Sequence, residues 1–299
     1  MDPTDYRRTV WQGIEVHLPA AWELIRYGSD YRRGVCLFAD EFAERFQLAW
    51  QREMDRPDLD RLMSDIKAKE LTTPTAEGGG LAPTCALWPA FGPWRGVTAR
   101  QGDAVRTRAV CYRAEERLLL ETAAFWNRTP EIETEHAILG SIRVHAREDW
   151  RPWEAFGIRA EVSTALGLTA CRCVPADAEL TFRGPRPRPW ASVRRMGFVR
   201  AWLREPVADW LKAKLPEGWK LLSADASEIA AGHPSARMTA AARRGLLGLA
   251  ASGHARRQEL AVLCPSEQRL YHVIQEFDQD PAPALLKISC ACGKSLLPD

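Results

Sequence analysis

Alternation of apolar and polar residues marks the first 50 positions of the chain. Ile14, Val16 and Leu18 are separated by polar neighbours, and Pro19 follows them. This pattern is typical of a β-strand with one buried face. Similar short apolar segments, separated by breaks rich in Asp, Glu and Gly, predict three more strands at residues 22–27, 34–39 and 45–51. The pattern therefore predicts an antiparallel meander.

Helical spacing replaces this alternation at residues 58–70, where four apolar residues fall on one stripe: Leu59, Leu62, Met63 and Ile66. Three further strands are predicted at residues 94–100, 104–113 and 117–126, and a second helix at 131–142. Acidic residues open that helix, where the backbone dipole favours negative charge. We interpret them as a solvated first turn: Glu131, Glu133 and Glu135.

The chain contains similar segments in its two halves. Residues 109–125 align with 261–277, so that Glu115 matches Glu267 and Arg117 matches Arg269. Two more matches occur in the same order, Trp11 with Trp153 and residues 56–69 with 205–215. Three ordered matches favour a duplication. We therefore predict two tandem units, residues 1–147 and 148–299, that pack as a pseudo-dimer within one chain.

Each unit is predicted to be α+β, with an antiparallel sheet and helices packed on it. The second unit is expected to repeat the strands of the first near residues 235–243 and 258–278 and to end in a shorter helix after Pro283.

One unit resembles the PsbP/Mog-type fold. The residues that carry the resemblance are Leu18, Pro19, Trp22 and Glu23 at the opening and residues 137–142 at the close. This fold occurs in the PsbP subunit of photosystem II, in the Mog protein that binds the GTPase Ran, and in the Eag chaperones of secreted effectors. The resemblance implies two tandem PsbP/Mog-like units in a binding or accessory protein, such as a chaperone or adaptor for a protein partner.

Composition narrows the class of protein. The 299 residues are 46% hydrophobic, which is enough for two cores. With 41 basic and 39 acidic residues the net charge is +2, so the chain as a whole has no general attraction for nucleic acid or an anionic membrane. We also find neither a signal-peptide pattern nor an apolar stretch approaching the roughly 20 residues of a membrane helix. A cytoplasmic protein without membrane insertion is expected.

Four of the eight cysteines form two close pairs. Cys290 and Cys292, followed by Gly293, resemble half of a zinc-ribbon knuckle. Cys171 and Cys173 fall in a predicted strand, where residues two apart share a face. The first unit has no such pair. The pattern favours reduced thiols that pack or lie exposed, and the alternative is a zinc site whose candidate ligands are Cys171, Cys173, Cys290 and Cys292.

Residues 183–204 contain seven arginines and no acidic residue. Alternating proline and arginine predict an extended loop between strands. Such a run could bind phosphates, but the nearly neutral chain argues against nucleic acid as the ligand. An acidic protein partner remains as an alternative, and the candidate partner-binding residues are Arg186, Arg188, Trp190, Arg194 and Arg195.

No catalytic residue is predicted, because the chain has no GxSxG, HExxH, GxGxxG or phosphate-loop pattern. The sequence therefore favours a non-catalytic cytoplasmic binding or accessory protein. Two alternatives stay open: a zinc-binding protein that uses the two cysteine pairs, and an enzyme with a site between the two units.

Overall fold

The computed structural model describes residues 6–72, 84–145, 149–185, 189–230, 232–242, 255–278, 284–290, 292–293 and 295–296. The chain divides into two compact units. The first comprises Met1–Thr9 and Ile14–Ala146, and the second comprises Val10–Gly13 and Arg147–Asp299. The predicted boundary between residues 147 and 148 lies outside the described residues.

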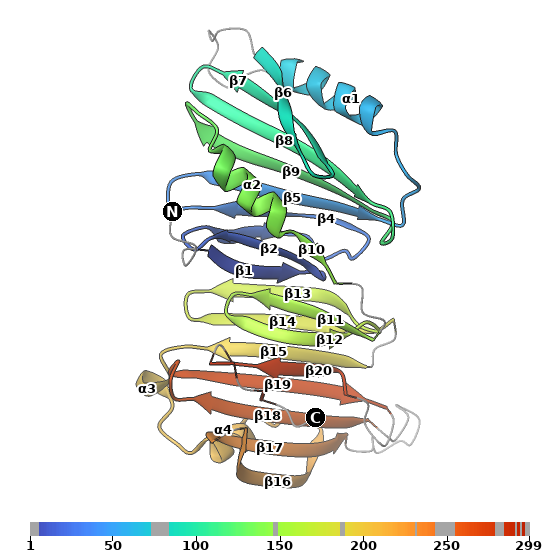
Figure 1. Ribbon diagram of the computed structural model, residues 1–299. Coiled ribbons are helices and arrows are strands. Elements are labelled where there is room, and N and C mark those ends of the chain that lie inside the picture. Colours follow the sequence, from blue (N-terminus) through green and yellow to red (C-terminus); the bar gives the residue numbers. More distant parts are fainter. Residues whose placement is uncertain are drawn as a thin grey trace. The chain divides into compact units, whose positions relative to one another are not determined.

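The fold is rich in β-structure, and the predicted α+β class is wrong. Within the ranges given above there are 20 strands and four helices, and the paired strands run antiparallel (Figure 1). The predicted helix after Pro283 is instead strand β20 (Leu286–Ser289), because buried Leu286 and Ile288 alternate with exposed Lys287. None of the helices in the described part of the chain is long and apolar enough to span a membrane.

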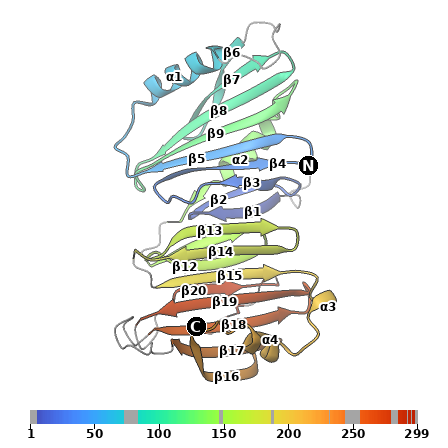
Figure 2. The ribbon, with the colours of Figure 1, turned by 180° about the vertical axis from the view of Figure 1, so that it is seen from behind.

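The first unit is built on a seven-stranded sheet with the order β3-β4-β5-β9-β8-β7-β6 (Figures 1 and 2). Its strands are β3 (Glu23–Tyr27), β4 (Arg33–Ala39), β5 (Glu44–Arg52), β6 (Thr84–Phe91), β7 (Trp94–Gln101), β8 (Ala104–Arg113) and β9 (Leu118–Asn127). Helix α1 (Leu59–Thr72) crosses between β5 and β6. It packs Ile66 against Val97 and Val110 of the sheet.

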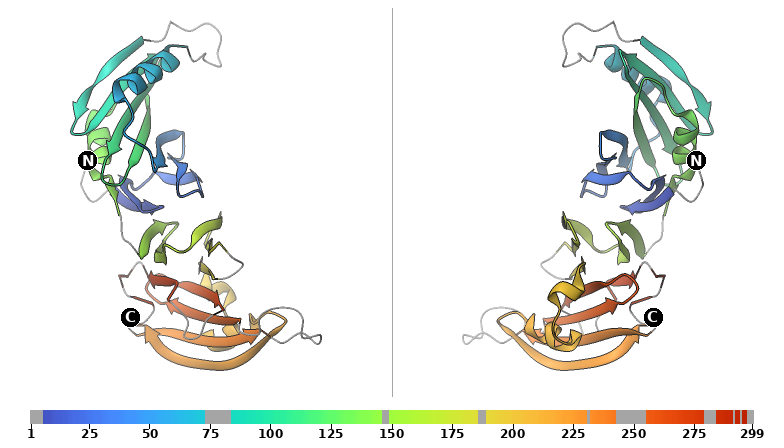
Figure 3. Two further views of the ribbon diagram at one scale, coloured as in Figure 1. Left: turned by 90° about the vertical axis from the view of Figure 1, so that its right-hand side faces the viewer. Right: turned by 90° about the vertical axis from the view of Figure 1, so that its left-hand side faces the viewer.

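The second unit has a seven-stranded sheet with the corresponding order, β13-β14-β15-β19-β18-β17-β16. Its strands are β13 (Gly167–Val174), β14 (Asp177–Arg183), β15 (Trp190–Met196), β16 (Trp219–Ala230), β17 (His233–Ala242), β18 (Arg256–Cys264) and β19 (Arg269–Phe277). Two register shifts interrupt the β16–β17 pairing, and both strands are visibly curved (Figure 3). Helices α3 (Val199–Trp202) and α4 (Val207–Ala213) cross between β15 and β16.

Shorter strands complete each half of the chain. They are β1 (Tyr6–Trp11), β2 (Ile14–Pro19) and β10 (Arg143–Val144), and then β11 (Trp150–Ala155), β12 (Ile158–Ser163) and β20. Strand β10 pairs with β2, and β20 pairs with β12. The β1–β2 turn has two left-handed residues, Gln12 and Gly13, with φ of 53° and 75°. Phe156 and Gly157 have φ of 54° and 70° in the β11–β12 turn, so both hairpins use the same turn geometry.

Strand registers refine the comparison of the two halves. The sequence alignment matches Arg117 with Arg269. However, the left-handed residue that ends the β8–β9 turn is Arg117, with φ of 48°, and its counterpart in the β18–β19 turn is Gln268, with φ of 53°. The alignment is therefore displaced by one residue here, because similar side chains at a turn align more readily than the backbone positions that set the register.

Helix α2 (Ile132–Ser141) corrects the interpretation of its acidic residues. Glu135 is buried, with 3% of its surface exposed, and is not part of a solvated turn. One carboxylate oxygen accepts a hydrogen bond from Trp88 Nε1 at 2.8 Å, and the other accepts one from Trp126 Nε1. Two indole donors thus satisfy the buried carboxylate and hold α2 on the sheet.

Candidate metal centre

Two neighbouring strands of the second unit bring a histidine and a cysteine together. His233 begins β17 and Cys264 ends β18. Because these strands are antiparallel, with Ser235 opposite Val262, the same register places His233 opposite Cys264 at one end of the pair. Both side chains are buried.

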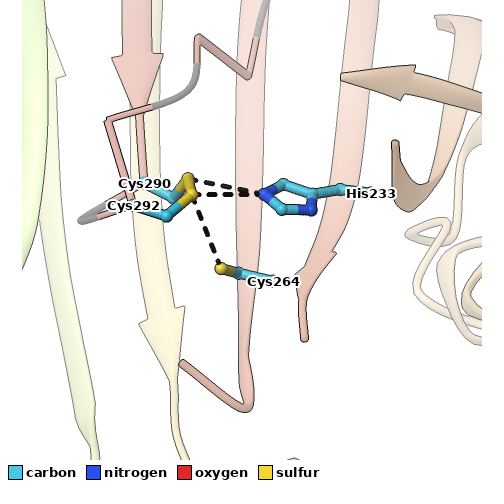
Figure 4. Close-up of side chains that lie close together, drawn as sticks. All are labelled: His233, Cys264, Cys290 and Cys292. Carbon is cyan, nitrogen blue, oxygen red and sulfur yellow. Dashed lines mark hydrogen bonds between the residues drawn. A yellow bond between two sulfur atoms is a disulfide. The ribbon is translucent and has the colours of Figure 1, made fainter. Parts of the chain in front are cut away.

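The segment after β20 adds two more cysteines to this end of the sheet. Gly293 N–H donates to the carbonyl of Cys290 at 2.9 Å, and Leu296 N–H donates to the carbonyl of Ile288 at 2.7 Å. Gly293 has a φ of +82°, which favours glycine. The chain thereby reverses, and Figure 4 shows Cys290 and Cys292 directed toward His233 and Cys264.

The four potential ligand atoms all lie within 4.8 Å of one another, so the group could hold a metal ion. His233 Nε2 lies 3.4 Å from Cys292 Sγ and 3.5 Å from Cys290 Sγ. Cys264 Sγ lies 4.0 Å from Cys292 Sγ. Tetrahedral zinc, with bonds of about 2.3 Å to sulfur and about 2.0 Å to nitrogen, requires separations of roughly 3.5–3.8 Å between its ligand atoms. These three distances are close to that requirement.

Cys290 and Cys292 are joined by a disulfide in this structure, with their Cα atoms 5.3 Å apart (Figure 4). A disulfide sulfur is not a thiolate, and thiolates are the metal ligands. The metal-binding state therefore requires this bond to be reduced, so that the two sulfurs can separate and bind the ion independently.

Glu267 and Tyr271 support the centre from the β18–β19 hairpin. Cys292 N–H donates to Glu267 Oε1 at 3.3 Å, and Tyr271 Oη donates to Glu267 Oε2 at 2.8 Å. Burial, together with the hydrogen bond to Glu267, raises the pKa of Tyr271. The phenol therefore stays protonated and fixes the carboxylate that positions the backbone of Cys292.

The structure places the other predicted cysteine pair elsewhere. Cys171 and Cys173 lie on β13, the edge strand that is separated from β18 by β14, β15 and β19. The metal-binding group found among the described residues contains Cys290 and Cys292 of the predicted set, together with His233 and Cys264. Sequence reasoning missed these last two because their proximity depends on the β17–β18 register. The available signal was a histidine and a cysteine that lie at the ends of neighbouring strands.

The predicted partner-binding arginines are engaged within the protein where they are described. Arg194 donates two hydrogen bonds of 2.8 Å to the carboxylate of Asp177, which lowers the pKa of that carboxyl group. Arg195 donates to the carbonyl of Phe156 at 2.9 Å, and Trp190 Nε1 donates to Glu276 at 2.6 Å. Arg186 and Arg188 lie outside the described residues. Trp190, Arg194 and Arg195 therefore hold the sheet and its neighbouring turn together.

A second polar cluster lies on β18 and β19. The side chain of Glu259 is fully buried and accepts hydrogen bonds from His272 and Arg257, and Arg257 also donates to Glu276. Burial raises the pKa of Glu259, but the hydrogen bonds and charges of His272 and Arg257 outweigh this effect and lower it. Trp190 occupies the second oxygen of Glu276. These mutual contacts indicate a structural ion network.

Equivalent positions in the first unit differ chemically. The registers place Gly92 and Arg113 where the second unit has His233 and Cys264. Val144 of β10 corresponds to Cys290 in the same way. At the described positions, the first unit therefore does not repeat the metal-binding group of the second.

The ion network, in contrast, has a counterpart in the first unit, in which the carboxylate lies on the other strand. Arg108 of β8 lies 3.6 Å from Glu121 of β9, and the equivalent residues Glu259 and His272 lie 2.6 Å apart. Both pairs take the same diagonal position across a strand pair. The geometry is thus shared by the two units, although the carboxylate and its nitrogen-containing partner have exchanged strands.

No protein-family model matches the chain, and no curated protein matches it.

Proposed function

We propose that this protein is a zinc-binding, non-catalytic accessory protein, with one zinc ion held by His233, Cys264, Cys290 and Cys292. The observation that carries the proposal is the convergence of four ligand atoms within 4.8 Å of one another. Three thiolates and one imidazole form a known ligand set for structural zinc, and soft sulfur ligands favour zinc over magnesium or calcium.

A structural role follows from the number of ligands. Four protein ligands complete a tetrahedral shell, whereas catalytic zinc sites keep one position for water or substrate. The ion would connect three separate parts of the second unit: the start of β17, the end of β18 and the segment after β20. The predicted chaperone or adaptor role, in which the protein binds a protein partner, remains a prediction.

Metal analysis of the full chain tests this function. The protein, purified under reducing conditions, is expected to contain about one zinc per chain, and Cys264→Ser should lose most of it because only three ligands remain. Cobalt substitution gives a second measurement, since thiolate-bound tetrahedral Co²⁺ has characteristic visible absorption.

The chain offers a matched control. Cys171 and Cys173 have the same spacing as Cys290 and Cys292 but lie on the edge strand β13. The double variant Cys171→Ser/Cys173→Ser should keep its zinc. Loss of zinc from this control, or a reduced wild-type chain that takes up none, would contradict the assignment of the ligands.

A further inference from the structure

We infer that the Cys290–Cys292 pair is a site of reversible oxidation by hydroperoxides, at which formation of the disulfide expels the zinc ion. This inference rests on the proposed function. The same two sulfurs belong to the metal-binding group and are joined as a disulfide in this structure. The two states exclude one another, because oxidation removes two of the four ligands.

Unequal exposure of the ligands identifies the sulfur that meets the oxidant. His233, Cys264 and Cys290 are buried, whereas Cys292 is exposed. Oxidation of a cysteine depends on its thiolate character and on access. Zinc keeps Cys292 as a thiolate, and its exposure admits a small peroxide. Cys292 is therefore the attacking residue.

Cys290 is the residue that completes the disulfide. Its Cα atom lies 5.3 Å from that of Cys292, within the range of ordinary disulfides. Cys264 Sγ lies 4.0 Å from Cys292 Sγ, but it is fixed at the end of β18, with Ser266 Oγ 3.2 Å from its sulfur. The turn closed by Gly293 brings Cys290 and Cys292 together without moving the sheet.

The reaction balances in two steps. The Cys292 thiolate attacks one oxygen of the hydroperoxide, an S–O bond forms, the O–O bond breaks, and the leaving oxygen takes a proton from solvent. The Cys290 thiolate then attacks the sulfur of the Cys292 sulfenic acid, the S–S bond forms, and hydroxide leaves and is protonated to water. The two thiolates lose two electrons and the peroxide gains them. Only His233 and Cys264 then remain as possible ligands, and two ligands are too few to hold the zinc ion, which is released.

Hydrogen peroxide titration of the zinc-loaded full chain tests the inference. A chromophoric chelator reports released zinc, and mass spectrometry of tryptic peptide 288–294, which contains both cysteines, reports the loss of two hydrogens. We expect one zinc to be released for each disulfide formed, and a thiol reductant with added zinc should restore the starting state. The Cys171→Ser/Cys173→Ser control should respond as the wild type does.

Several outcomes separate this inference from the proposed function. A chain that binds zinc but keeps it while peroxide is consumed overturns the oxidation site alone. A Cys264–Cys292 bond, seen as a cross-link between peptides 258–269 and 288–294, also overturns it. A reduced chain that binds no zinc overturns both proposals. Because the wild-type peptides report the bond directly, the test does not depend on the folding of a cysteine variant.

Discussion

The stability of the first unit depends in part on a charged residue that forms hydrogen bonds with several partners. Glu15 on β2 is bonded to Arg8 at 2.8 Å, to His145 at 2.8 Å and to His17 at 3.0 Å. Burial alone would raise the pKa of Glu15, but these hydrogen bonds and the charge of Arg8 outweigh it and lower the pKa to about 2. The carboxylate therefore joins β1, β2 and the residue after β10.

The variant Glu15→Gln should destabilise the protein by about 1–3 kcal/mol at pH 7, the usual cost of losing hydrogen bonds to a charged group. A carboxyl group whose pKa is lowered on folding stabilises above its unfolded pKa. The difference between wild type and variant should therefore shrink as the pH falls from about 4.5 toward about 2. Urea unfolding at pH 7, 5 and 3 measures it, and a difference that is constant with pH would contradict the role of the carboxylate.

Residue-scale patterns predicted part of this structure. Alternation located the strand that begins at Ile14, because one face of β2 is more buried than the other. Apolar segments between polar breaks located the strands that begin near Gly34 and Ala104. The same reasoning failed for Glu135, since its spacing on a helix says nothing about two indole donors that approach from β6 and β9. Of the metal-binding group, only Cys290 and Cys292 were predicted. The proximity of the other two ligands depends on the register of β17 and β18.

At the scale of elements, each seven-stranded sheet has a helix in the connection between its third and fourth strands along the chain, and an apolar contact holds this helix on the sheet. In the second unit, Trp210 and Leu211 of α4 belong to one cluster with Met238 of β17 and Ala261 of β18. In the first unit, α1 adds charge to its apolar contact, since Glu70 accepts hydrogen bonds from Arg106 and Arg108. Helical spacing predicted α1, but strand β6 could not be recognised from the sequence without knowledge of its pairing in the sheet.

Two leucines test the contribution of α4. Leu211 is 1% exposed, and Leu211→Ala should cost about 2–5 kcal/mol because it leaves a cavity in the cluster. Leu222 on β16 is 48% exposed, so Leu222→Ala should change stability by no more than about 0.5 kcal/mol. Equal losses for both variants in chemical denaturation would show that α4 does not stabilise the sheet through this cluster.

For the whole molecule, the two units share a strand order, and the metal-binding group found among the described residues lies in the second. Sequence similarity indicated the repetition, because matched segments recur in the same order along both halves. It could not predict every strand of the sheets. Strand β16 lacks strong alternation, and the four residues of β20 are too few to identify a strand without its pairing with β12.

Zinc removal should therefore affect the two units differently. A ligand that binds only the folded state stabilises it by mass action. A chelator added under reducing conditions should speed amide hydrogen exchange in β17, β18 and β20 and leave β5, β8 and β9 unchanged. Exchange measured by mass spectrometry resolves these segments, and an equal increase in the first unit would contradict a stabilising ion that is confined to the second.

The carboxylate lies on opposite strands in the pairs Arg108–Glu121 and Glu259–His272, and this limits how parts of this chain can be transplanted. A chimera that carries β8 in place of β18 alone would set the guanidinium of Arg108 against His272, and the reciprocal graft would set Glu259 against Glu121. Moving β8 together with β9 keeps opposite charges facing one another. The unit of modular exchange between the halves is consequently the hairpin, since a lone strand would separate each carboxylate from the nitrogen-containing side chain that pairs with it.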